Sequence, residues 1–196
     1  MTYPRRIVAL DLETSDKNKA YGYIKQIACV VMEDGEVIGD PFYKTVEVPK
    51  SARIALEAVE AQIGSLQDKA KVAEWLTGFL SGDSASDVFD ELLAWSALHR
   101  ASDYPNVAQN LHFDLSFVTD RLLFPYKLRG NPFSPVWIDT LELARQMMPG
   151  KRSYALGHLC SMLGLPEQDK AHDALQDAIL AGRVYHRLTT DAQVTA

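Results

Sequence analysis

The feature that most constrains this chain is its first apolar run, Ile7 to Leu10, which leads directly into Asp11-Leu12-Glu13. An apolar run of this length predicts a buried strand. Side chains two residues apart on a strand share a face, so Asp11 and Glu13 place two carboxylates together where the strand leaves the core. A divalent cation with oxygen ligands would relieve their repulsion. An acidic strand end that faces water is the alternative.

The composition is that of an ordinary globular chain, and 196 residues suit one domain spanning residues 1–196. A net charge of -6 argues against a broad basic surface for duplex nucleic acid. It still allows nucleic acid at a small site where cations supply the positive charge. Cys29 and Cys160 lie in apolar runs and are expected in the core. Without a signal peptide or a membrane-length apolar stretch, we expect no membrane partner and a cytoplasmic location.

The order of the predicted elements indicates an α/β fold, with a mixed five-stranded sheet flanked by helices. The turn sequence Asp34-Gly35 predicts a hairpin between the second and third strands. The expected strands cover residues 6–14, 27–32, 37–48 with a break at Pro41, 106–109 and 136–138. The expected helices cover a helical region at 51–100, a helix that stops before Pro125, and residues 141–147, 154–163 and 174–188.

Two further carboxylates follow predicted elements. Asp114 comes shortly after the fourth strand, and Asp177 lies in the last helix. The run Asp173-Ala174-Leu175-Gln176 has the form of a capping box, which predicts Asp173 as the N-cap. His172 and Asp177 then occupy the two positions that often hold the apolar pair of a hydrophobic staple. This geometry predicts an imidazole near a carboxylate at the start of the last helix.

At this point the chain resembles the DEDDh 3′→5′ exonucleases, which include the proofreading epsilon subunit of polymerase III, ribonuclease T and oligoribonuclease. The resemblance rests on three motifs in order. They are D-x-E at Asp11 and Glu13, N-x-x-F-D ending at Asp114, and H-x-x-x-x-D from His172 to Asp177. Residues 138–141 and 156–165 are also similar to the family. Each motif alone is weak, whereas the ordered set is specific.

The resemblance implies an RNase H-like exonuclease fold that removes mononucleotides from the 3′ ends of single-stranded DNA or RNA, with DNA slightly favoured. It implies two Mg²⁺ or Mn²⁺ ions, held by Asp11, Glu13, Asp114 and Asp177. It makes His172 the general base, since an imidazole titrates near neutral pH.

Residues for substrate contacts are chosen by position around the motifs. The resemblance points to Leu12 and Thr14 for the terminal nucleotide. Asn110 either contacts substrate or fixes the turn from strand to helix, and Asp139 is expected to be a helix cap. Lys151 and Arg152 precede a helix and either touch phosphate or form a solvated loop.

Three departures from the family pattern affect the substrate side of the site. Thr14-Ser15-Asp16 lacks the glycine that often follows D-x-E, and Gln109 stands where the family often has histidine. The region 51–100 is longer than usual, with an extra helix at about 67–80. This insertion either covers the active site and sets substrate choice or only adds core.

A second hypothesis is a module with an exonuclease fold that binds nucleic acid or a polymerase without cutting. The complete motif set favours the enzyme. The last helix is expected to end about eight residues before the end of the sequence, which favours a standalone enzyme over a subunit with a polymerase-binding extension. Several similar enzymes are dimers, so a homodimer is an open alternative.

Overall fold

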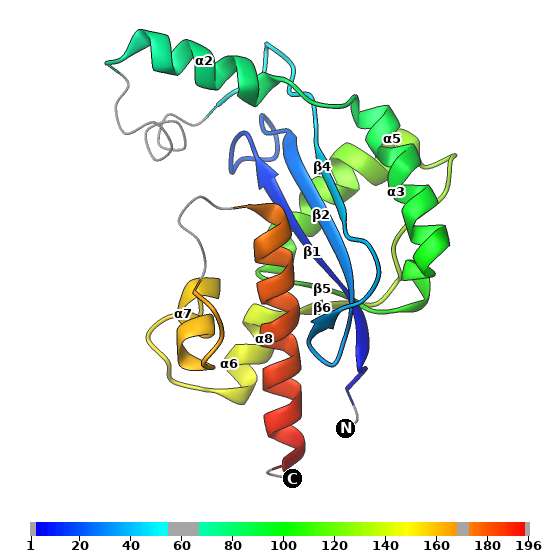
Figure 1. Cartoon of the computed structure of the whole chain (residues 1–196), viewed down its shortest axis with the longest axis vertical. Coiled ribbons are helices and arrows are strands. Elements are labelled where there is room, and N and C mark those ends of the chain that lie inside the picture. The colour runs from blue at the N-terminus through cyan, green and yellow to red at the C-terminus, as the bar shows by residue number, and fades with distance from the viewer. Residues whose placement is uncertain (1–2, 55–66, 168–172, 195–196) are drawn as a thin grey trace.

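The computed structural model describes residues 3–54, 67–167 and 173–194, and the segment 55–63 of the helical region falls outside this part. Helices and strands are arranged as in Figure 1. The strands are β1 (Arg6–Thr14), β2 (Ile24–Glu33), β3 (Glu36–Val37), β4 (Phe42–Thr45), β5 (Asn106–Ala108) and β6 (Trp137–Asp139). The helices are α2 (Lys69–Leu80), α3 (Ala85–His99), η1 (Ala101–Asp103), α4 (Leu111–Phe117), η2 (Val118–Leu123), α5 (Phe124–Tyr126), α6 (Thr140–Met147), α7 (Leu156–Met162) and α8 (Ala174–Val194).

The described strands form one mixed sheet in the order β3-β2-β1-β5-β6, with β4 also paired to β2. β1 is antiparallel to β2 and parallel to β5, which is parallel to β6. The mixed α/β sheet is therefore confirmed, but it has six strands and the prediction of five was wrong. The expected third strand is divided into β3 and β4, because Gly39 adopts a left-handed φ of 74° and Pro41 has no N–H to donate.

The hairpin between β2 and β3 is confirmed. Asp34 and Gly35 have φ values of 52° and 84°, and Met32 pairs with Val37 across the turn. Two consecutive positive φ values give the turn whose twist matches a β-hairpin, and glycine and aspartate tolerate them.

Strict alternation along β1 sends its side chains into two separate cores. Val8, Leu10 and Leu12 pack on one face with residues of α3, α4 and η2. Ile7 and Ala9 pack on the opposite face under α6, α7 and α8. Asp11 and Glu13 continue the second row, so they emerge on the face that α8 covers.

The helix α8 packs directly against β1 and β2 (Figure 1). A Cβ built on Gly182 would lie 3.1 Å from the Cβ of Ala9 and would clash with the sulfur of Met32. Only glycine permits this approach without displacement of the neighbouring side chains. The contact fixes the separation between β1 and the helix that carries Asp177.

Two helix ends differ from the sequence-based expectation. The helical run after β5 passes through Pro125 and continues to Tyr126, because the π-helical turn η2 precedes the proline and shifts the hydrogen-bonding register. α8 extends to Val194 instead of about residue 188. Ser84 caps α3, since its hydroxyl accepts from the Asp87 amide. Among the described residues, no helix combines the length and apolarity that a bilayer crossing needs.

Candidate active site

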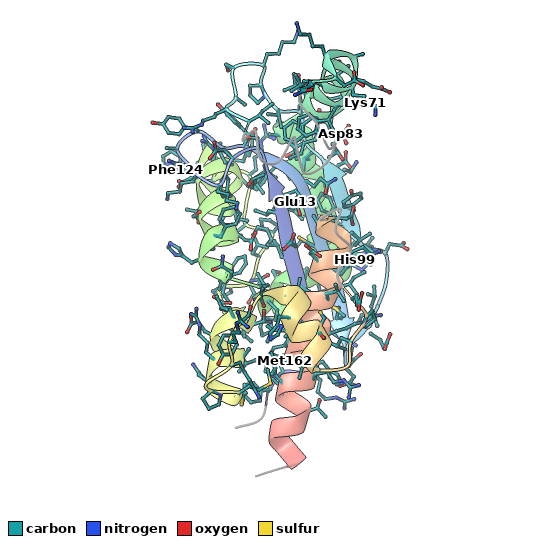
Figure 2. The ribbon with its side chains drawn as sticks, turned by 90° about the vertical axis from the view of Figure 1, so that its left-hand side faces the viewer. Glu13, Lys71, Asp83, His99, Phe124 and Met162 are labelled. Carbon is teal, nitrogen blue, oxygen red and sulfur yellow. The ribbon has the colours of Figure 1, made fainter. Side chains whose placement is uncertain are left out.

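Three carboxylates meet where β1 ends beneath the start of α8. Ligand oxygens of Asp11, Glu13 and Asp177 all lie within 4.8 Å of one another. β1 supplies the first two because they alternate onto the α8 face, and the first turn of α8 supplies the third. In Figure 2, Glu13 lies on β1 between the green helical run from α4 to α5 and the orange start of α8. The predicted meeting of these three residues is therefore observed.

Asp114 approaches the same end of β1 from the first turn of α4, where it is 3% exposed. The turn into α4 depends on Asn110, which adopts φ 58° and ψ 48° at the N-cap. Asparagine tolerates this left-handed conformation better than most residues. The amide of Asn110 donates to Oδ1 of Asp139 at 3.0 Å. These contacts support the structural reading of Asn110, and its role in substrate binding stays a prediction.

The electrostatics show that this cluster is unfavourable as a set of bare anions. Burial, with Asp114, Asp177, Glu13 and Asp173 nearby, raises the pKa of Asp11 well above its usual value. Burial and the charge of Glu13 raise the pKa of Asp114 to about 8, although the amides of Asp114 and Leu12 act in the opposite direction. Close, buried carboxylate oxygens are the ligand set of a hard divalent cation. The residues therefore fit a magnesium or manganese site.

The start of α8 is fastened to the sheet by side chains. Oδ1 of Asp173 accepts from the amides of Leu175 and Gln176, each at 3.1 Å, so the predicted cap is confirmed. Oδ2 of the same carboxylate accepts from the Tyr43 hydroxyl at 2.9 Å. The Ala174 amide donates to the side chain of Gln26 at 3.3 Å.

The candidate base precedes the cap of α8, and Tyr43 and Gln26 anchor this end of the helix to the sheet. His172 lies outside the described residues, so its proposed role is untested. Tyr43 and Gln26 were missed by the sequence reasoning. The register could have indicated Gln26, which pairs with Glu13 across β1 and β2. No local signal links Tyr43 to a carboxylate so distant in the sequence.

The substrate residues chosen beside D-x-E occupy different environments. The side chain of Leu12 is buried in the core beneath the sheet, so only its backbone is left for a ligand. Thr14 is half-buried, and its hydroxyl donates to the Asp16 carbonyl at 3.2 Å. Asp139 caps α6 by accepting from the Leu141 amide, as predicted. Substrate contact by Leu12 and Thr14 stays a prediction.

An open groove of about 480 Å³ lies beside α4 and α6. Its lining includes Asn110, Arg145, Arg152 and Tyr154. Gln109, which replaces the expected histidine, donates to the Tyr154 carbonyl at 2.8 Å and accepts from Thr140 at 2.5 Å. Gln109 therefore holds the loop that presents Arg152 to the groove. Lys151 is not among the groove-lining residues.

The sequence has curated relatives, although no family model matches it. It is 30% identical over 185 residues to "3'-5' exonuclease DinG" of Bacillus subtilis, covering 92% of this chain and 17% of that protein. It is 28% identical over 200 residues to "DNA polymerase III subunit epsilon" of Buchnera aphidicola, covering 97% and 73%. The chain spans less than a fifth of the length of the DinG and PolC-type relatives that it matches.

Solved exonuclease structures share the fold. The nuclease domain of 3'hExo, described as a DEDDh family member bound to rAMP, aligns with a TM-score of 0.71 and 19% identity over 96% of this chain and 94% of that one. Exonuclease X in complex with 5' overhanging duplex DNA aligns with a TM-score of 0.60 and 24% identity, covering 96% and 92%. A Mg²⁺- and Mn²⁺-bound form of S. pombe Pop2p aligns with a TM-score of 0.68 and 14% identity, covering 97% and 85%.

The fold is therefore the RNase H-like fold of the DEDDh-type exonucleases. The resemblance to 3′→5′ exonucleases that the three motifs indicate is confirmed by the relatives, and the solved structures share the fold.

Proposed function

We propose that this chain is a metal-dependent 3′→5′ exonuclease acting on single-stranded ends of nucleic acid. The observation that carries the proposal is the convergence of Asp11, Glu13 and Asp177 within 4.8 Å, with buried Asp114 beside them. The raised pKa values of Asp11 and Asp114 reflect negative charge that a protein of this size would not gather in its interior without a counterion.

Two Mg²⁺ or Mn²⁺ ions are the proposed cofactors, held by Asp11, Glu13, Asp114 and Asp177. When bound, such ions stabilise negative charge on the attacking and leaving oxygens of a phosphodiester. The carboxylates position the ions, and the separate cores on the two faces of β1 hold the strand that carries Asp11 and Glu13.

His172 is the proposed general base that accepts the proton of the attacking water. It directly precedes Asp173, whose carboxylate caps α8 and accepts from Tyr43. An imidazole titrates near neutral pH, so its neutral form is available to take a proton. General-base catalysis of this kind contributes roughly 10²- to 10⁴-fold in rate.

DNA is favoured slightly over RNA as the substrate. Several relatives are named as DNA polymerase III proteins, which supports DNA. The neighbouring structures include complexes with rAMP and with duplex DNA, so the fold alone does not determine whether the substrate is DNA or RNA. A protein distinguishes RNA from DNA by its contacts with the 2′-hydroxyl. Those relatives' names also make a polymerase a candidate partner.

A paired nuclease assay tests the proposal. The protein is given 5′-labelled single-stranded DNA and RNA with Mg²⁺, Mn²⁺ or EDTA. We expect products that shorten from the 3′ end, abolished by EDTA. Asp11→Asn should reduce the rate by roughly 10³-fold or more, since the metal contributes several kcal/mol. His172→Ala should reduce it by about 10²- to 10⁴-fold while metal binding persists.

The assay also separates the competing function. A folded protein that binds Mg²⁺ by calorimetry yet cleaves neither polymer would contradict the exonuclease and favour a binding module. Unchanged activity in His172→Ala would overturn the base assignment alone. Asp120→Asn is the control, because this half-exposed carboxylate pairs with Lys19 outside the acidic cluster.

A further inference from the structure

The loop that leaves the acidic cluster, residues 15–23, is held in one conformation by its own hydrogen bonds. The Ser15 amide donates to the Tyr23 carbonyl at 2.9 Å, and the Tyr23 amide donates to the Ser15 hydroxyl at 3.0 Å. The amides of Tyr21 and Gly22 both donate to the Asn18 carbonyl. A Cβ on Gly22 would lie 2.5 Å from the Asp16 carbonyl oxygen, so the loop packs tightly there.

This loop exposes the aromatic ring of Tyr21, and the guanidinium of Arg53 lies over the ring. Tyr21 is 53% exposed, and the guanidinium carbon of Arg53 lies 5.6 Å from the centre of its ring. Nε of Arg53 pairs with buried Asp16 at 3.1 Å, which orients the guanidinium. Asp16, which stands at the position where the family often has glycine, therefore orients Arg53. The loop that carries Tyr21 begins directly after β1, the strand that carries Asp11 and Glu13.

The loop is joined to a second exposed ring. Arg121 donates to the carbonyls of Lys19 and Gly22 and lies 4.7 Å from the ring centre of Tyr23. Three residues further on, Phe124 is 69% exposed and carries the Lys127 ammonium 5.1 Å from its ring centre. In Figure 2, Phe124 lies at the edge of the molecule, at the same end of the sheet as Glu13.

We propose that Tyr21 with Arg53, and beyond them Phe124 with Lys127, form a stacking surface for nucleotides upstream of the scissile bond. This proposal rests on the proposed exonuclease function. Exposed rings accept bases of any sequence, and guanidinium or ammonium groups beside them meet the phosphates. The surface also supplies local positive charge in a chain whose net charge is -6. Its occupant is a single strand, because duplex bases do not offer free faces.

Binding and turnover are measured separately. The binding probe is 5′-fluorescein-labelled dT12 in EDTA, followed by fluorescence anisotropy. Tyr21→Ala and Phe124→Ala should each weaken binding by roughly 5- to 100-fold. Tyr21→Phe keeps the ring and should bind like the parent protein. Leu98→Ala, at another exposed apolar residue, on α3, is the control that should change nothing.

The effect of the same surface on turnover should depend on the length of the substrate. Tyr21→Ala should raise KM for dT12 with little change in kcat, and should leave KM for a dinucleotide unchanged, since a dinucleotide does not reach the surface. Equal dT12 affinity in the parent protein and Tyr21→Ala would overturn the proposal, as would an equal loss in Leu98→Ala. If the protein binds dT12 through these rings but does not cleave it, the exonuclease function is contradicted and the proposed stacking surface stands.

Discussion

The hydroxyl of Tyr43 on β4 donates a hydrogen bond to the carboxylate of Asp173, the cap of α8, over 2.9 Å. Burial, together with the hydrogen bond and the negative charge of Asp173, raises the pKa of Tyr43 to about 12. The bond connects a strand at the edge of the sheet to the helix turn that carries Asp177. We therefore expect it to align Asp177, one of the proposed metal ligands.

Removal of this hydroxyl tests that alignment. Tyr43→Phe should lower the free energy of unfolding by about 1 kcal/mol, the usual net value of one hydrogen bond. It should also weaken Mg²⁺ binding several-fold, because outer contacts that orient ligands affect metal affinity. Thermal unfolding and calorimetric titration with Mg²⁺ measure the two effects.

Tyr104→Phe is the matched control. Its hydroxyl accepts from Arg6 at the opposite end of β1, so the same atom is lost far from the carboxylates. A similar loss of stability with unchanged Mg²⁺ affinity is expected. Equal Mg²⁺ affinity in both variants would show that Tyr43 serves stability alone.

The metal-free protein should become less stable as the pH rises. The folded pKa of Asp114 is about 8, far above its value in an unfolded chain, so the folded state holds this proton more tightly. The resulting stabilisation is complete below about pH 4 and is lost as the pH rises through about 8. Asp114→Asn in EDTA should therefore raise the melting temperature at pH 8.5 and leave it nearly unchanged at pH 4.

Magnesium should oppose this loss, because the cation replaces the proton as the partner of the carboxylates. Melting curves at pH 8.5 should shift upward with Mg²⁺ in the parent protein and less in Asp114→Asn. Asp120→Asn, on the same helical run, should resemble the parent protein throughout. A parent melting temperature in EDTA that rises between pH 5 and 8.5 would contradict the assigned pKa.

Lys25 on β2 anchors the end of α2. Its buried ammonium donates to the Ser81 carbonyl at 2.6 Å and to the Gly78 carbonyl at 3.5 Å, and lies 5.2 Å from the ring centre of Phe79. A cation at a helix C-terminus satisfies carbonyls that lack helical partners. Lys25→Met should cost about 1–3 kcal/mol and increase amide hydrogen exchange across α2.

The comparison for this variant is Lys44→Met. Lys44 pairs with Asp83 and Glu91 near the surface, where ion pairs contribute only about 0–1 kcal/mol. Exchange in α2 should therefore change far less than in Lys25→Met. Identical exchange profiles would show that α2 is held by other contacts.

Arg152 in the groove should act on substrate binding. Arg152→Ala should raise KM severalfold and leave kcat little changed, since phosphate contacts position a strand without entering the chemistry. The effect should shrink as salt concentration rises. Arg100→Ala, at an exposed arginine paired with Asp103, is the control. An unchanged KM would assign Arg152 to a solvated loop.

The acidic cluster was predictable because its residues obey local rules. Alternation along β1 placed Asp11 and Glu13 on one face, and the capping box placed Asp177 in the first turn of α8. Each rule involves residues a few positions apart. The meeting of these segments followed from the motifs' resemblance to the family, since composition and periodicity alone did not bring β1 and α8 together.

Features that depend on tertiary contact were not predictable. The continuation past Pro125 relies on a π-helical turn that no residue pattern announces. Pro41 indicated that the third strand is divided. The sequence did not indicate that the two parts, β3 and β4, pair separately with β2. Tyr43 and Arg53 are ordinary surface types in sequence, and only folding gives each a carboxylate partner.

The first strand and the last helix supply ligands to one cluster, so the site exists only when both ends of the fold have come together. A ribosome-bound chain that lacks α8 carries three of the four acidic residues, so its acidic cluster is incomplete. Contacts so far apart in sequence form late in folding. If the proposed function holds, nuclease activity therefore appears only after α8 has been synthesised and has packed on the sheet.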